Sequence, residues 1–141
     1  MAAGPVVKKV MEVYKDKVRL VIKNYPYKYR DYSRIAAEAS LAAREQGKYW
    51  EMHDLLIKRS PKLDRQSLIG YAKELGLDVA KFTASIDGQK YKAELDRDLK
   101  LAVDMDLYNT PTFYINGRQV VGERPFEYVK KIIDEELKKA K

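Results

Sequence analysis

Cysteine is absent from these 141 residues. The chain can therefore form no disulfide, supply no catalytic thiolate and offer no cysteine ligand to a metal. Histidine occurs once, as His53, so a multi-histidine metal site is excluded. We expect His53 to be a packed or surface residue, because the sequence shows no nucleophile for it to activate. The sequence predicts no metal site and no cofactor.

Long apolar runs and blocks of like charge are missing as well. No apolar stretch approaches the ~20 residues that cross a bilayer, and no signal peptide follows Met1. We therefore expect a cytoplasmic protein with no membrane partner. The net charge of +7 arises from 28 basic residues interspersed with 21 acidic ones. This mixed pattern lacks the basic stripe typical of nucleic-acid binding, so we expect no nucleic-acid partner.

The composition that is present suits one folded domain. Hydrophobic residues make up 45% of the chain and charged residues 35%, which is a globular balance rather than that of a disordered chain. A chain of this length can bury a substantial core.

A hairpin between residues 112 and 121 is the strongest local signal. Residues 112–115 and 118–121 are β-branched and aromatic runs, which favour strands. Asn116-Gly117 between them favours a two-residue turn, because that turn needs positive φ at both positions. Pro111 stands immediately before the first run and either caps the strand or forms a cis turn.

The sequence around this hairpin carries a family resemblance. Asn-Thr-Pro-Thr-Phe-Tyr-Ile-Asn-Gly-Arg at residues 109–118, followed by Val-Val-Gly, resembles the cis-proline loop and hairpin of DsbA-like thiol:disulfide oxidoreductases, within the thioredoxin-fold superfamily. Members usually have Gly-Thr-Pro or Gly-Val-Pro here. Asn109 replaces the glycine, and asparagine tolerates left-handed φ.

The resemblance implies a substrate-binding role for the loop. In the family, the cis peptide turns the backbone before the proline toward the cysteine pair, where it binds an extended peptide like an added strand. This role falls here on Asn109, Thr110 and Pro111. The alternative is that Pro111 only forms a rigid structural turn.

A helical block precedes the hairpin. Residues from 33 to 106 show a helical period of apolar residues, with Asp64 and Asp78 at positions suited to N-caps. Lys-Tyr-Trp-Glu-Met-His-Asp-Leu-Leu at residues 48–56 closely resembles DsbA-like sequence. We therefore expect an α/β thioredoxin-like fold in a single domain, residues 1–141, with a helical insertion at about 33–106.

The first central strand of that fold has no counterpart in the chain. Residues 5–14 predict an amphipathic helix, and Pro-Val-Val-Lys-Lys-Val at its start resembles the helix that follows Cys-x-x-Cys in the family. Residues 18–22 predict a buried strand, and residues after Pro125 predict a last helix. The missing strand would pair with residues 18–24 on one side and 112–115 on the other. We expect that the two flanking strands close up, that a partner chain supplies the pairing, or that subunits exchange elements in a homo-oligomer.

The resemblance and the composition together define two functional hypotheses. The family activity is protein thiol–disulfide exchange by a low-pKa thiolate, and this chain has no catalytic cysteine for that step. We expect a redox-inactive, truncated member of the oxidoreductase family. The alternative is a redox-inactive thioredoxin-like module that binds peptides or proteins at the cis-proline loop.

An aromatic and basic segment, Tyr-Pro-Tyr-Lys-Tyr-Arg-Asp-Tyr at residues 25–32, has two interpretations. It could form a stacking surface or the rim of a ligand site. Alternatively, its tyrosines pack over the edge of the core with their hydroxyls in water.

Overall fold

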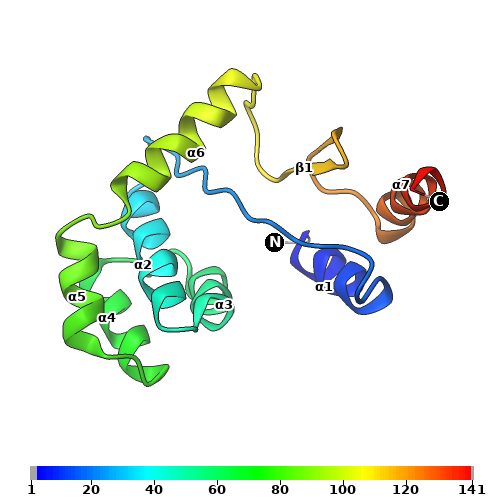
Figure 1. The fold of residues 1–141 in the computed structure, drawn as a ribbon. Helices are drawn as coiled ribbons and strands as arrows, with labels where there is room; N and C mark the ends of the chain where they lie inside the picture. The colour runs from blue at the N-terminus through cyan, green and yellow to red at the C-terminus, as the bar shows by residue number, and fades with distance from the viewer. Residues whose placement is uncertain (1–2, 141) are drawn as a thin grey trace. The chain divides into compact units, whose positions relative to one another are not determined.

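The computed structural model describes residues 3–140, and the chain divides into two compact units (Figure 1). The first unit comprises the described parts of residues 1–22 and 106–141, and the second comprises residues 23–105. The helical unit thus interrupts the first unit once, and it begins earlier than the insertion predicted from the sequence. The assignment of all 141 residues to a single domain stays a prediction.

Seven helices and two strands are found among residues 3–140. In chain order they are α1 (Ala3–Val13), α2 (Ser33–Glu45), α3 (Tyr49–Arg59), α4 (Arg65–Glu74), α5 (Val79–Asp87), α6 (Lys92–Asp104), β1 (Thr112–Ile115), β2 (Arg118–Val121) and α7 (Phe126–Lys139). Within the described residues, no helix is both long and apolar enough to cross a membrane.

The hairpin forms as the sequence predicts. β1 and β2 pair antiparallel, with Thr112 opposite Val121 and Ile115 opposite Arg118. Asn116 and Gly117 have φ values of 48° and 86°, which is the left-handed region that a two-residue turn of this kind requires.

Tyr14 joins the two helices of the first unit. It follows α1, is 5% exposed, and its Oη donates a hydrogen bond to Asp134 Oδ1 of α7 at 2.5 Å. The Lys9 ammonium of α1 lies 4.2 Å from the centre of the Phe126 ring at the start of α7. These contacts hold α1 against α7.

The strand predicted at residues 18–22 is wrong. The sheet contains β1 and β2 alone among the described residues, and residues 18–22 form no ladder with either of them. The segment still alternates, with Val18, Leu20 and Ile22 partly buried and Arg19 and Val21 exposed. A strand needs a hydrogen-bonded neighbour, and the described chain supplies none here. Pairing by a partner chain and exchange between subunits stay predictions.

The helical unit has the larger core. Met52, Leu68 and Phe82, from α3, α4 and α5, are fully buried in one apolar cluster. Ala39 and Ala43 of α2 belong to the same cluster, and their small side chains let the other helices approach α2 closely. Burying a side chain the size of Phe, Leu or Met is worth about 1.5–3 kcal/mol, so this cluster is the main stabilising element of the unit.

Two predicted N-caps fix where helices of this unit begin. Asp64 accepts a hydrogen bond from the Ser67 N–H at the start of α4, and Asp78 accepts one from the Lys81 N–H at the start of α5. Each carboxylate satisfies a backbone donor that has no partner within its own helix.

Candidate functional site

The three predicted site residues form one loop directly before β1. Asn109 and Thr110 are exposed and Pro111 is half-buried, and the Thr110–Pro111 peptide bond is cis. The φ of Asn109 is not positive, so the tolerance of asparagine for left-handed φ is not used at this position.

Two hydrogen bonds fix this loop to the hairpin. The Thr112 hydroxyl donates to the Asn109 carbonyl at 2.7 Å, which closes the loop on itself. The Gly122 N–H donates to the Pro111 carbonyl at 2.8 Å, one residue beyond the last pair of the ladder. The loop is therefore a continuation of β1 rather than a separate segment.

One edge of β1 pairs with β2, and the opposite edge is called here the outer edge of β1. Paired residues of an antiparallel ladder alternate between hydrogen-bonded and non-hydrogen-bonded. Because Pro111 bonds to Gly122, the register makes Phe113 with Val120 a bonded pair as well. The backbone N–H and C=O groups of Thr112 and Tyr114 consequently face the other edge of β1, where no strand lies among residues 3–140. This edge can accept a further strand.

Side chains around the hairpin hold it without occupying that edge. Gln119 Nε2 donates to Tyr114 Oη at 2.8 Å across the two strands. Arg118 on β2 donates to Glu135 Oε2 on α7 at 2.5 Å, and this bond lowers the pKa of Glu135. Arg118 and Gln119 are consecutive on β2, so these two contacts lie on opposite faces of the hairpin.

The chemistry available at this loop is hydrogen bonding and apolar contact. The sequence contains no cysteine, and among the described residues no group of histidine, aspartate or glutamate side chains is arranged to hold a metal ion. The arrangement can bind an extended backbone, and the thiolate of thiol–disulfide exchange would have to come from elsewhere.

His53 lies beside two aromatic rings of its own helix, α3. Its ring stacks on Tyr49 with the centroids 5.9 Å apart and meets Trp50 edge-on. His53 Nδ1 is buried with no hydrogen-bond partner among the described residues. With its side chain 31% exposed, this placement agrees with the packed or surface histidine expected from the sequence.

Asp98 holds the chain in place just before the aromatic segment, a role that was not predicted from the sequence. It lies on α6, is 5% exposed, and accepts hydrogen bonds from Lys23 Nζ at 3.0 Å and from the Asn24 N–H at 2.9 Å. These two bonds hold residues 23 and 24 against α6, directly before the aromatic segment at residues 25–32. The available signal was its spacing, since Asp98 lies three residues after Leu95 and four before Ala102 on the buried face of α6.

Some tyrosines of the aromatic segment at residues 25–32 pack together, and others are exposed as a stacking surface would require. Tyr25 and Tyr27 meet edge-on with centroids 5.2 Å apart, as expected for rings that pack together. Tyr29 and Tyr32 are 77% and 50% exposed, so these two rings face water rather than the core.

Comparison with known proteins shows the same fold and family. The family described as thioredoxin matches residues 2–135. A thioredoxin-like oxidoreductase from Silicibacter pomeroyi DSS-3 is similar in structure, with a TM-score of 0.85 and 28% identity, and the match covers 96% of this chain and 78% of that one. The thiol-disulfide exchange protein alpha-DsbA2 from Wolbachia pipientis gives a TM-score of 0.82 at 20% identity, over 95% of this chain and 73% of that one.

Curated relatives share sequence with this chain over a small part of their length. The Na(+)/H(+) antiporter NhaA from Herminiimonas arsenicoxydans is 41% identical over 107 residues, which is 76% of this chain and 17% of that protein. The chain thus spans less than a fifth of the curated relatives it matches first. The match to the family model over residues 2–135, together with the helical insertion and the hairpin that follows the cis Thr110–Pro111 bond, shows that this chain belongs to the thioredoxin family and has a DsbA-like fold.

Proposed function

We propose that this chain is a redox-inactive thioredoxin-fold module that binds an extended segment of a peptide or protein along the outer edge of β1. The bound segment would lie beside the loop formed by Asn109, Thr110 and Pro111. Redox inactivity follows from the composition, because thiol–disulfide exchange needs a thiolate and the chain has no cysteine.

The orientation of the Thr112 and Tyr114 backbone carries this proposal. Their N–H and C=O groups face the edge of β1 opposite β2, where the described chain places no strand. Strand addition at such an edge supplies main-chain hydrogen bonds to an incoming peptide of almost any sequence. Phe113 and Ile115 are partly buried and Tyr114 is exposed, so specificity would come from alternate side chains of the ligand.

A matched pair of proline substitutions tests the proposal. Tyr114→Pro removes an N–H on the outer edge of β1, and Gln119→Pro removes the corresponding N–H on the outer edge of β2. Neither N–H takes part in the pairing of β1 with β2, so both variants should keep the hairpin. The probe is an acetylated peptide of alternating threonine and valine. Binding is followed by amide hydrogen exchange at Thr112 in all three proteins, and also at Tyr114 in the natural chain and in Gln119→Pro. Loss of binding in Tyr114→Pro with retention in Gln119→Pro supports the proposal, and equal loss or no binding contradicts it.

A second candidate is that this sequence is the cysteine-free part of a longer DsbA-like oxidoreductase. It is supported by the match that covers 96% of this chain and only 78% of the S. pomeroyi oxidoreductase, which leaves part of that chain without a counterpart. A strand and a Cys-x-x-Cys pair encoded outside these residues would then complete the sheet along β1. Reading the gene in frame upstream of Met1 distinguishes the two candidates. A strand followed by Cys-x-x-Cys supports the longer enzyme, and an in-frame stop supports the binding module.

A further inference from the structure

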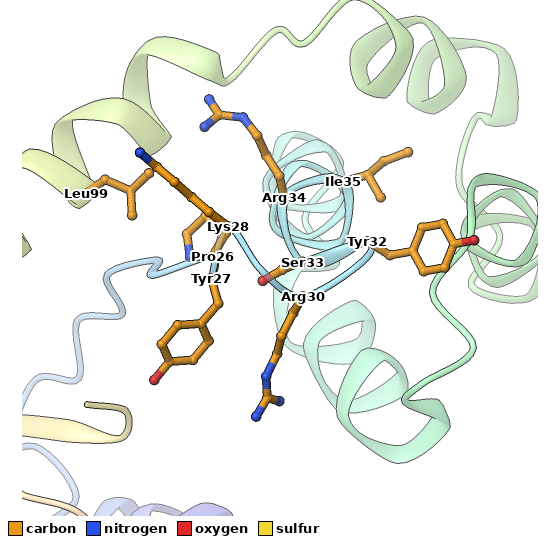
Figure 2. Close-up of a pocket in the computed structure, with 9 residues that line it drawn as sticks. All are labelled: Pro26, Tyr27, Lys28, Arg30, Tyr32, Ser33, Arg34, Ile35 and Leu99. Carbon is orange, nitrogen blue, oxygen red and sulfur yellow. The ribbon is translucent and has the colours of Figure 1, made fainter. Parts of the chain in front are cut away.

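A hollow in the helical unit is not used by the proposed function. Its volume is about 430 Å³, and it lies between the segment after Pro26, the first turn of α2 and the Leu99 side of α6 (Figure 2). This volume lies within the range of about 300–1,000 Å³ that is typical of small-molecule sites.

Cationic side chains surround the hollow. Lys28 and Arg30 are exposed and form no ion pair among residues 3–140, whereas Arg34 donates to Asp96 at 2.7 Å. Figure 2 shows Lys28 and Arg34 reaching toward the Leu99 side of the hollow and Arg30 pointing the other way. The Lys28 ammonium is therefore the cation on that side without a carboxylate partner in the described chain.

Part of the remaining wall is apolar, and Tyr27, Tyr32 and Ser33 add hydroxyl groups to it. Pro26 is buried, and Ile35 and Leu99 are half-buried beside the hollow. An apolar wall beside an unpaired ammonium suits a ligand that has a hydrophobic body and a negatively charged group. A bare inorganic anion would leave the apolar wall in water, and a neutral ring would gain no ion pair from the exposed Lys28 ammonium.

We propose that this hollow binds a small anion with a flat apolar body, such as an aromatic phosphate or an aromatic carboxylate. The anionic group pairs with Lys28, with Arg34 beside it. The apolar body lies against Pro26, Ile35 and Leu99. This site is independent of the β1 edge, because all its residues belong to the helical unit.

Titration of the full chain with phenyl phosphate, followed by two-dimensional NMR of the backbone amides, tests the proposal. Saturable shifts should appear at residues 27–35 and at Leu99. Inorganic phosphate and phenol, titrated separately, should each bind more weakly than phenyl phosphate. If either of them binds as tightly, the hollow does not recognise the combination of charge and ring, and the proposal is wrong.

Substitutions of Lys28 and of Leu99 measure separately what the charge and the apolar wall contribute to binding. Lys28→Gln should weaken phenyl phosphate binding by about fivefold, the upper range for one partly exposed ion pair. Lys58→Gln makes the same charge change at an exposed position of α3 outside the hollow and should leave binding unchanged. Leu99→Ala should weaken phenyl phosphate binding but not inorganic phosphate binding. Equal weakening by Lys28→Gln and Lys58→Gln, or shifts spread over lysines throughout the chain, would overturn the proposal.

Discussion

Asp98 of α6 accepts a hydrogen bond from the backbone N–H of Asn24 at 2.9 Å, across 74 residues of sequence. The same carboxylate accepts from Lys23 Nζ at 3.0 Å. Asp98 is 5% exposed, whereas the Lys23 side chain is 59% exposed. The backbone bond is therefore the better shielded of the two, and it fixes the point at which the chain enters the aromatic segment.

Asp98→Ala should destabilise the helical unit by about 1–3 kcal/mol, because it leaves the Asn24 N–H without its acceptor. Lys23→Ala should cost less than about 1 kcal/mol, because its ammonium is exposed to solvent. Urea denaturation of both variants measures the two values. An equal loss in the two variants would mean that the ion pair, rather than the backbone bond, holds this segment.

Because Glu38 is buried, its contribution to the free energy of unfolding should decrease as the pH rises. Glu38 is 2% exposed, its Oε2 accepts from the Tyr91 N–H at 3.1 Å, and its Oε1 has no partner among the described residues. Burial raises the pKa of Glu38, and the Tyr91 hydrogen bond only partly opposes this. A raised pKa in the folded state favours folding while the group is protonated, and this contribution is lost as the pH rises above the usual glutamate pKa of about 4.3. The stability of the natural chain relative to Glu38→Gln should therefore decrease with pH.

Glu94 serves as the control, because its contribution to stability should change with pH in the opposite direction. Arg44 donates two hydrogen bonds of 2.7 Å to this carboxylate, and this pairing lowers the pKa of Glu94. Its contribution is present above the usual glutamate pKa and is lost as the pH falls. The stability of the natural chain relative to Glu94→Gln should therefore increase with pH. Thermal unfolding between about pH 3 and pH 7 measures both slopes, and slopes of the same sign would contradict the assignment.

The Tyr14 hydroxyl should ionise at a higher pH than that of an exposed tyrosine. Burial and the hydrogen bond to Asp134 raise the pKa of Tyr14 to about 12. Protonated Tyr14 thus stabilises the fold, and the contribution is lost as the pH rises from about 10 through this raised value. Tyr14→Phe should cost about 1 kcal/mol at neutral pH and reduce the late step of the tyrosinate absorbance titration. Tyr29→Phe, at a ring 77% exposed, should leave the free energy of unfolding at neutral pH unchanged.

Two glycines should respond to alanine in opposite directions. Gly117 has a φ of 86° in the hairpin turn, and nothing lies within 4 Å of an added Cβ there. Gly117→Ala should therefore cost about 1–2 kcal/mol through backbone strain alone. Gly70 lies inside α4 with equally open space, so Gly70→Ala should stabilise by about 0.5–1 kcal/mol. Denaturant midpoints measure both, and destabilisation by Gly70→Ala would show that space rather than conformation decides at that site.

Several elements could be predicted because their causes are local. Asp64 and Asp78 cap helices through bonds to N–H groups three residues away. Asn116-Gly117 fixes the register of the hairpin because the turn needs positive φ at both positions. The loop formed by Asn109, Thr110 and Pro111 is contiguous in sequence, so its place before β1 could also be predicted.

The sequence by itself determined the helices, the hairpin, the family resemblance and the absence of a thiolate, since each depends on residue type and short spacing. Only the tertiary structure decided that residues 18–22 form no strand, because a ladder depends on a neighbour distant in sequence. It also decided that Asp98 is buried against Asn24 and that Lys28 lies beside an apolar wall. The spacing of Asp98 places it on the buried face of α6, but no local pattern identifies Asn24 as its partner, because that depends on which distant segments pack together.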